Sequence, residues 1–330
     1  MTASGPAATT RGAEPAAARP PHPEFRRGVG LGVAAYGMWG LFPLYWALLP
    51  PASAIEGLAH RIAWSLVAVL AALWFVNRRG RVGHGELRAA LRDRRKALPL
   101  AAAAIVISCN WGTYIWAVNS GHVVETSLGY FINPLATVVL GVLVLGERLR
   151  PAQWAAVGLG TVAVVVLTVG YGRPPWIALV LAASFAFYGL MKKFAMVGAV
   201  ESQAIETGVM LLPAIGYLVV LEASGSGTFF DHGLSHSLVL VGTGLISAAP
   251  LLAFGGATLR VPLSLLGLLQ YLAPVLQFLI GILVFGEQMP PERWFGFGLV
   301  WAALAVLTWD GLRAGFSRGR RAASAAGRPR

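Results

Sequence analysis

The sequence predicts an all-α integral membrane protein with ten transmembrane helices, arranged as two inverted five-helix repeats. Three observations predict this fold class: the composition, the recurrence of long apolar stretches, and an internal repeat. The 330 residues are 56% hydrophobic and 12% charged, whereas a soluble domain carries roughly 25% charged residues. So few charges do not cover the surface of a soluble protein of this length. The composition therefore excludes most soluble enzymes and nucleic-acid-binding proteins.

Ten apolar stretches are long enough to cross a hydrocarbon core of ~30 Å as helices. We place them at residues 28–49, 54–76, 98–118, 124–146, 151–170, 174–192, 205–222, 237–258, 263–286 and 291–310. A membrane β-barrel would instead need segments that alternate between apolar and polar residues. The run Val162–Leu167 is apolar at every position, and such runs favour helices.

These stretches divide the chain into four parts. Residues 1–27 contain no apolar run, so we expect a disordered cytosolic tail rather than a cleavable signal. Residues 28–170 form the first predicted five-helix repeat, and residues 174–310 form the second. Residues 311–330 are polar and basic, and we expect them to form a second disordered cytosolic tail.

The 26 Arg and Lys residues predict the orientation in the membrane. If both termini lie in the cytoplasm, 23 of the 26 are cytosolic, only Arg173 and Arg293 lie outside, and Arg61 lies within a span. This distribution satisfies the positive-inside rule. Cytosolic Arg and Lys residues are attracted to anionic lipids, which explains the net charge of +12. Membrane lipids are therefore an expected partner, and nucleic acid is not.

No cofactor or metal site is expected. The chain lacks the G-x-x-x-x-G-K-[ST] phosphate-binding loop, so we expect no transport driven by its own ATP hydrolysis. The single cysteine, Cys109, excludes an internal disulfide and a cysteine-based metal cluster.

Two segments match each other without a gap at an offset of 140 residues. Both carry prolines, glycines, a glutamate and a tryptophan in register. The matched pairs include Pro134/Pro274, Gly146/Gly286, Glu147/Glu287, Pro151/Pro291 and Trp154/Trp294. Since five spans is an odd number, the second repeat enters the membrane inverted relative to the first. Inverted repeats are common in secondary transporters, where two halves exchange conformations and open a central site alternately to each side.

Five further segments carry a specific pattern of aromatic, amide and glycine residues. They are Trp39–Trp46, His60–Ser65, Asn110–Asn119, Ser127–Pro134 and Gly267–Pro274. In these segments the chain resembles the RarD branch of the EamA-like drug/metabolite transporters, and the similarity runs from Gly28 to Asp310. The resemblance implies a ten-helix permease of the bacterial inner (cell) membrane, and it implies no particular ligand.

Ionisable residues within the predicted spans are candidates for function, because a charge there costs about 2.5–3.5 kcal/mol on insertion scales. Glu56 and His60 share a helix face, and Arg61 follows directly. Arg61 is a candidate fixed positive charge for substrate, while Glu56, His60 and Glu206 are candidates for proton coupling. Two alternatives remain open: an internal ion pair between helices for the first three, and an exposed carboxylate at a helix N-terminus for Glu206.

Aromatic and amide side chains in the span 98–118 suit an amphipathic organic ligand. Trp111 and Tyr114 lie three residues apart, and Asn110 and Tyr114 lie four apart, so one helix face carries rings and an amide. These three residues are candidate substrate ligands. An aromatic belt at the membrane interface is the alternative for the aromatic residues of this span.

Prolines in two matching spans predict helix breaks, at Pro134 and Pro274, because proline removes a helix hydrogen bond. Paired broken helices in the two halves point to a transport site. Polar residues beside the prolines are therefore candidate substrate ligands: Tyr130, Asn133, Gln270, Tyr271 and Gln277. The alternative is a static kink in each helix.

The sequence thus favours a secondary transporter that moves a small organic metabolite or drug-like compound by alternating access. Export is the expected direction, and proton coupling is a hypothesis. No catalytic residue is predicted, so we expect no enzyme; an integral membrane lipid-modifying enzyme and a non-transporting membrane receptor are the alternatives. A monomer and a homodimer both fit the sequence.

Overall fold

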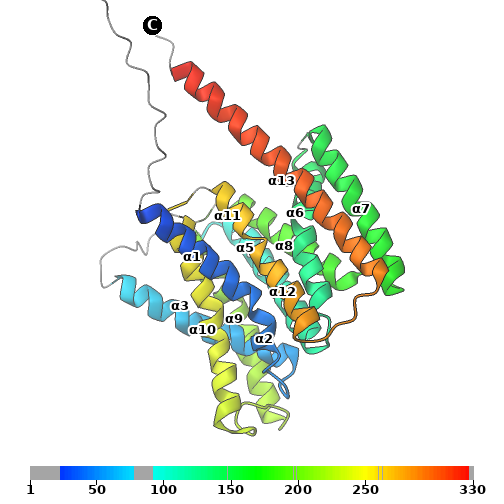
Figure 1. The fold of residues 1–330 in the computed structure, drawn as a ribbon. Coiled ribbons are helices and arrows are strands. Elements are labelled where there is room, and N and C mark those ends of the chain that lie inside the picture. The colour runs from blue at the N-terminus through cyan, green and yellow to red at the C-terminus, as the bar shows by residue number, and fades with distance from the viewer. Residues whose placement is uncertain are drawn as a thin grey trace, which may run out of the picture.

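A computed structural model describes residues 23–77, 92–146, 148–195, 197, 199–258, 260–261 and 263–326. Every regular element within these ranges is a helix (Figure 1). The helices are α1 (Pro23–Gly40), α2 (Phe42–Trp46), α3 (Ala54–Asn77), α5 (Arg94–Asn119), α6 (Val123–Leu145), α7 (Pro151–Tyr171), α8 (Trp176–Ala195), α9 (Ala199–Ala223), α10 (Gly233–Thr258), α11 (Leu263–Leu269), α12 (Leu272–Leu283) and α13 (Pro291–Ala326). The predicted all-α class is therefore confirmed for the part of the chain that the structure describes.

Eight helical segments among the described residues are long and apolar enough to cross a membrane. They are Arg94–Asn119, Val123–Leu145, Pro151–Tyr171, Trp176–Ala195, Ile205–Ala223, Gly233–Thr258, Leu265–Leu283 and Pro291–Gly311. The chain is thus a multi-pass membrane protein. The two remaining predicted spans, 28–49 and 54–76, fall on α1–α2 and on α3, which are not among the eight. The count of ten stays a prediction.

The two predicted tails are shorter than expected. Helix α1 begins at Pro23, and α13 continues to Ala326, so 311–326 is helical where we expected disorder. Propagation of an existing helix is far less costly than nucleation, and Ala and Arg are good helix formers. Residues 1–22 and 327–330 of the predicted tails, and 78–91 of the basic loop, lie outside the described residues.

The two prolines expected to break helices behave differently. Helix α6 continues from Val123 to Leu145 with Pro134 inside it, so the predicted break at Pro134 is wrong. Membrane helices tolerate proline where neighbouring groups take over the freed backbone positions. The matching span is interrupted at Gln270–Tyr271. Pro274 lies just after this interruption, in the first turn of α12, where the missing N–H has no helical partner to lose.

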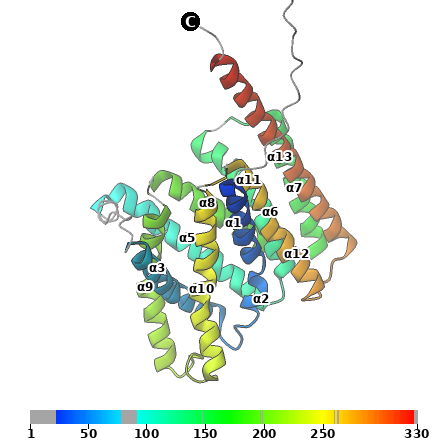
Figure 2. The ribbon, with the colours of Figure 1, turned by 60° about the vertical axis from the view of Figure 1, so that its left-hand side comes forward.

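Helices α7 and α13 lie side by side at one edge of the molecule (Figure 1 and Figure 2). They run antiparallel. Arg150, directly before α7, forms an ion pair with Asp310 in α13 at 2.8 Å. At the other end, Gly170 of α7 contacts Glu292 in the first turn of α13. Contacts at both ends fix the register of the two helices.

Helices α6 and α12 also pack antiparallel. A Cβ atom on Gly281, near the end of α12, would lie 2.7 Å from Cγ2 of Val124 at the start of α6. Only glycine allows this close approach. Phe278 of α12 joins Leu128 and Phe131 of α6 in one buried apolar cluster, which stabilises the pair.

Four helices pack together in one group: α3, α5, α9 and α10. Helix α3 packs against each of the other three, and α5 packs against α9. Helices α1 and α8 flank this group, α1 against α10 and α8 against α5. In Figure 2 the α9–α10 hairpin extends away from the α7–α13 pair. The candidate site lies within the group formed by α3, α5, α9 and α10.

Candidate functional site

Arg61 is buried in α3 among aromatic rings. Its side chain is 6% exposed, and its guanidinium carbon lies 3.8 Å from the centre of the Trp111 ring of α5. The rings of Trp46 and Phe42 lie at 5.5 and 5.9 Å. Such cation–π contacts are worth about 2 kcal/mol when desolvated. Two of the predicted substrate ligands, Arg61 and Trp111, are therefore in contact.

The guanidinium borders a small cavity between α3, α5, α9 and α10. The cavity volume is about 30 Å³, enough for about two water molecules. Its polar lining comes from both halves of the chain. The lining side chains that can form hydrogen bonds are Arg61, Ser65, Ser108, Trp111, Glu206, Thr207 and Ser247. The rest of the lining is apolar, so the hollow combines a largely apolar wall with a few polar groups that can hold a charged or polar group.

Arg61 has a charge without a counterion in the described part of the chain. No residue there forms a hydrogen bond or ion pair with it, and its Nε is buried without a partner. The buried Oγ of Ser108, on the same cavity wall, also lacks a partner. Buried charges in folded proteins are normally paired, so this is an unusual arrangement.

Glu206 lies on the opposite wall and is fully satisfied. It is 3% exposed, which excludes the exposed interfacial position considered from the sequence. Its carboxylate forms an ion pair with Lys192 at 2.9 Å. It also accepts hydrogen bonds from the hydroxyls of Tyr188 at 3.0 Å and Ser202 at 2.5 Å. The negative charge of Glu206 is therefore already balanced from α8.

Glu56 and His60 do not border the cavity. The buried carboxylate of Glu56 accepts hydrogen bonds from the backbone N–H of Thr228 at 2.7 Å and from its hydroxyl at 2.8 Å. The same hydroxyl lies 2.8 Å from Nε2 of His236. His60 stacks on Phe229 with ring centres 4.9 Å apart. These contacts tie the start of α3 to the segment before α10 through hydrogen bonds and ring stacking, rather than through the ion pair between helices that was the alternative.

Two predicted amide ligands serve as ties between helices. Asn110 of α5 donates from Nδ2 to the carbonyl of Leu181 at 3.0 Å and to Ser184 at 2.8 Å, both in α8. Gln277 of α12 donates from Nε2 to the carbonyl of Trp39 at 3.1 Å. Neither residue borders the cavity.

The other predicted ligands divide between two regions. Tyr114 and Tyr130 have ring centres 5.8 Å apart, and both lie within electrostatic reach of Arg61. Tyr271 borders a separate, open hollow beside Trp301. Asn133 and Gln270 are half-buried and border neither hollow. Pro134 and Pro274 border neither one as well, so the expected shared pocket at the prolines is not found there.

The sequence reading missed the small hydroxyl side chains of the cavity wall. Ser65, Ser108, Thr207 and Ser247 lie in α3, α5, α9 and α10 and line the cavity. Serine and threonine in apolar spans commonly lie at helix–helix contacts. This signal exists in the sequence, but it does not separate cavity residues from ordinary packing residues.

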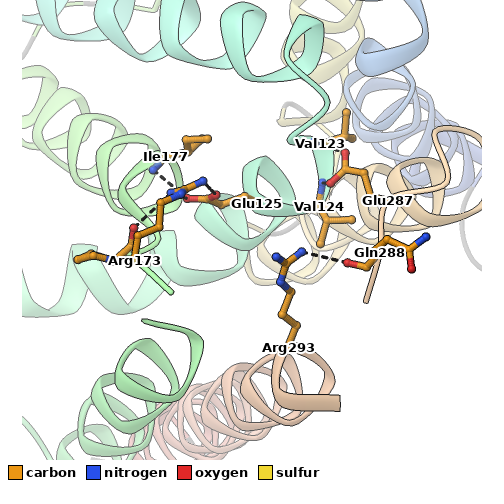
Figure 3. Close-up of polar contacts among 9 residues, drawn as sticks. Val123, Val124, Glu125, Arg173, Ile177, Glu287, Gln288 and Arg293 are labelled. Atoms are coloured by element: carbon orange, nitrogen blue, oxygen red, sulfur yellow. Dashed lines mark hydrogen bonds and ion pairs between the residues drawn. The ribbon is translucent and has the colours of Figure 1, made fainter. Parts of the chain in front are cut away.

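Glu287 forms a contact between the two halves, outside the candidate spans (Figure 3). Its carboxylate accepts hydrogen bonds from the backbone N–H groups of Val123 and Val124, the latter at 3.0 Å. It thereby caps the N-terminus of α6. Burial raises the pKa of Glu287 above its usual value, and the two N–H donors act in the opposite direction. The repeat partner, Glu147, lies outside the described residues.

A second acidic contact lies nearby, at the same end of α6 (Figure 3). Glu125 is 1% exposed and pairs with Arg173 at 2.8 Å. It also accepts a hydrogen bond from the backbone N–H of Ile177 at 3.1 Å. Glu125 therefore joins α6 to the start of α8.

The chain is similar to known transporters along most of its length. The model of the EamA-like transporter family matches residues 26–169. Protein RarD of Streptomyces exfoliatus is 61% identical over 290 residues, which cover 88% of this chain and 90% of the relative. Protein RarD of Escherichia coli is 39% identical and covers 87% and 95% of the two chains. The uncharacterized transporter YojE of Bacillus subtilis is 40% identical and covers 88% and 96%.

The fold also has a counterpart among solved structures. One protein crystal structure aligns with a TM-score of 0.53 over 86% of this chain and 98% of that chain. Sequence identity in this alignment is 21%, so the likeness concerns the fold alone.

Proposed function

The chain belongs to the EamA-like transporter family, in its RarD branch, and from this premise we propose that it is a secondary transporter of a small organic compound. It acts in the bacterial inner membrane, with both termini in the cytoplasm, and exports its substrate by alternating access. The observation that carries the proposal is the cavity at Arg61, built by α3 and α5 of the first half and α9 and α10 of the second. A site shared by both halves is what alternating access requires.

Packing of the repeat partners supports the inverted arrangement. Helices that match in sequence, α6 with α12 and α7 with α13, pack against each other and run antiparallel. Other contacts match when each helix is replaced by its repeat partner, α1 by α8, α3 by α9 and α5 by α10. The contact of α5 with α8 then becomes that of α10 with α1, and the contact of α3 with α10 becomes that of α9 with α5. Exchange of the two halves leaves this pattern unchanged, as expected for two copies of one unit in opposite orientation.

We interpret the structure as an occluded state of this mechanism. A cavity of about 30 Å³ is too small for a drug-sized molecule, since ligand pockets measure roughly 300–1,000 Å³. In the proposed orientation, two sets of hydrogen bonds lie at the outer side of the membrane. Glu287 bonds to the start of α6, and Glu56 bonds to Thr228. Opening to the outside would have to release such contacts.

We assign proton coupling to Glu206. Of the three predicted candidates, only Glu206 borders the cavity. Uptake of a proton by its carboxylate would release Lys192 and change the charge balance at the substrate. Glu56 and His60 act instead in the contact between α3 and Thr228.

Efflux from proteoliposomes tests the proposal. Liposomes with and without the purified chain are loaded with a bacterial metabolite extract, and released compounds are identified by mass spectrometry. The proposal predicts protein-dependent release of a restricted set of small organic compounds, reduced by Trp111→Ala and retained in Trp309→Ala, whose ring is exposed and away from the cavity. Release equal to that from empty liposomes would contradict transport. Protein-dependent change in the lipids would instead indicate the lipid-modifying enzyme, and binding without release the receptor.

A further inference from the structure

Arg61 leaves one positive charge to be neutralised inside the bundle. We infer that the cavity binds a small organic monoanion, with its carboxylate or equivalent group on the guanidinium of Arg61 and its apolar body against the surrounding rings. This inference rests on the proposed function and assigns its substrate class.

The charges on the cavity wall indicate that the bound group has a single negative charge. Two charged side chains border the cavity among the described residues, Arg61 and Glu206. Glu206 is paired with Lys192 at 2.9 Å, so its charge is accounted for. Arg61 has no counterion in the same part of the chain. A bound group with a single negative charge balances the site, whereas a dianion leaves an excess charge and a cation adds to the imbalance.

The hydrogen-bond donors around the cavity indicate that the bound group is a carboxylate or an equivalent acceptor. Trp111 covers one face of the guanidinium, and a stacked guanidinium keeps its N–H edge available for in-plane hydrogen bonds. The buried Nε of Arg61 and the buried hydroxyl of Ser108 both lack partners. A carboxylate accepts from two N–H groups of an arginine at once and still has lone pairs for a hydroxyl. Its oxygens would therefore satisfy the unpaired donors of this wall.

The surrounding rings determine the rest of the substrate. Trp111 borders the cavity beside apolar side chains such as Ile107 and Met210. Phe42 and Trp46 lie within 6 Å of the guanidinium carbon but outside the present lining. Rings stacked on a substrate contribute large contact area with little loss of entropy. We therefore expect a planar or branched apolar body attached to the anionic group. The present cavity accommodates only the head group, and the body enters when the halves move apart.

Thermal unfolding of the full chain in detergent tests the inference with three matched probes. Benzoate, benzamide and benzylamine share a ring and differ in charge: anionic, neutral and cationic. We expect benzoate to raise the melting temperature by about 1–3 °C at saturating concentration, with no shift from the other two. Inorganic phosphate should give a smaller shift than benzoate. Equal shifts from benzamide or benzylamine, or no shift from benzoate, would overturn the inference.

Variants assign the shift to the cavity. Arg61→Gln should abolish the benzoate shift, and Arg61→Lys should retain part of it because the charge remains. Arg260→Gln is the matched control, since this arginine pairs with Glu24 away from the cavity, and it should retain the full shift. A full shift in Arg61→Gln would overturn the assignment.

Anionic lipid is the other source of a single negative charge, and nanodiscs distinguish it. In nanodiscs of phosphatidylcholine alone, benzoate should bind to the chain. It should bind equally in nanodiscs that also contain phosphatidylglycerol. Loss of benzoate binding in the second lipid mixture would assign the site to a lipid headgroup and overturn the substrate class.

Failure of the inference differs from failure of the transport proposal. If benzoate binds at Arg61 but no compound leaves the proteoliposomes, the anion site is supported and the transport proposal is contradicted. If proteoliposomes release only neutral or cationic compounds, the transport proposal is supported and the anion site is contradicted.

Discussion

Glu206 of α9 and Lys192 of α8 form an ion pair of 2.9 Å at the wall of the cavity that contains Arg61. The pair explains why one cavity can hold a buried carboxylate and a buried guanidinium without joining them. It also makes Arg61 the charge that is available to a ligand.

Loss of Lys192 should destabilise the chain. Lys192→Gln leaves the carboxylate of Glu206 buried at 3% exposure without its cation, and we expect a loss of about 1–3 kcal/mol in the free energy of unfolding. The double variant Lys192→Gln/Glu206→Gln should recover most of this loss, because it removes the unpaired charge. Thermal unfolding of the three proteins measures both effects. A double variant that is less stable than Lys192→Gln would show that the charge of Glu206 is not the cause.

Removal of the Arg61 charge should not weaken the folded state. A buried charge without a counterion is costly to the folded state, and its removal offsets the loss of the cation–π contact, which costs about 0.5–2 kcal/mol. We expect Arg61→Met to unfold at the same temperature as the wild type or above it, while its benzoate response is lost. A fall of more than about 5 °C would indicate that Arg61 has a structural role.

Close packing of α10 on α3 should depend on Gly244. A Cβ atom at this position would lie 2.3 Å from the backbone carbonyl carbon of Trp64, and backbone atoms do not move aside as side chains do. Gly244→Ala should therefore cost about 1–3 kcal/mol or more. Gly255→Ala is the matched control on the same helix, because nothing lies within 4 Å of its added Cβ, and it should be neutral or stabilising. Equal melting temperatures for the two variants would contradict this packing.

Stability should depend on pH through Glu287. Burial raises the pKa of Glu287 from its usual 4.5, so the folded chain holds a proton there more tightly than the unfolded chain. The resulting stabilisation is fully present below the usual pKa and is lost as the pH rises through the raised value. Glu287→Gln should remove this contribution, so the difference in melting temperature between wild type and variant should change across the mildly acidic range. A difference that is constant with pH would show that Glu287 does not titrate there.

Hydropathy predicted the all-helical class and most of the spans, because a bilayer imposes length and composition directly on each span. Eight of the predicted spans coincide with helical segments that meet the length and hydropathy expected of a span. Arg61 and Trp111 were each predicted as substrate ligands, Arg61 because a charge within a span needs a special environment. The two side chains are in contact, and their role in substrate binding stays a prediction. Asn110 and Gln277 were also predicted as substrate ligands, but their amides donate to backbone carbonyls of other helices. Such partners depend on how helices cross in space.

The proline prediction shows the same limit. Pro134 and Pro274 are identical in the sequence repeat, yet one lies inside a continuous helix and the other in a first turn. The outcome depends on the neighbours of each helix rather than on the proline itself.

Access to Ser247 from the two sides of the membrane tests alternating access most directly. Ser247 borders the cavity on α10, and Leu245 on the same helix is exposed on its outer face. Single-cysteine variants at each position, in a Cys109→Ser background, are exposed to a membrane-impermeant thiol reagent in right-side-out and inside-out vesicles. The account predicts labelling of Ser247→Cys from both sides and no labelling of Leu245→Cys, which faces lipid. Labelling of Ser247→Cys from one side only, or from neither, would contradict the account.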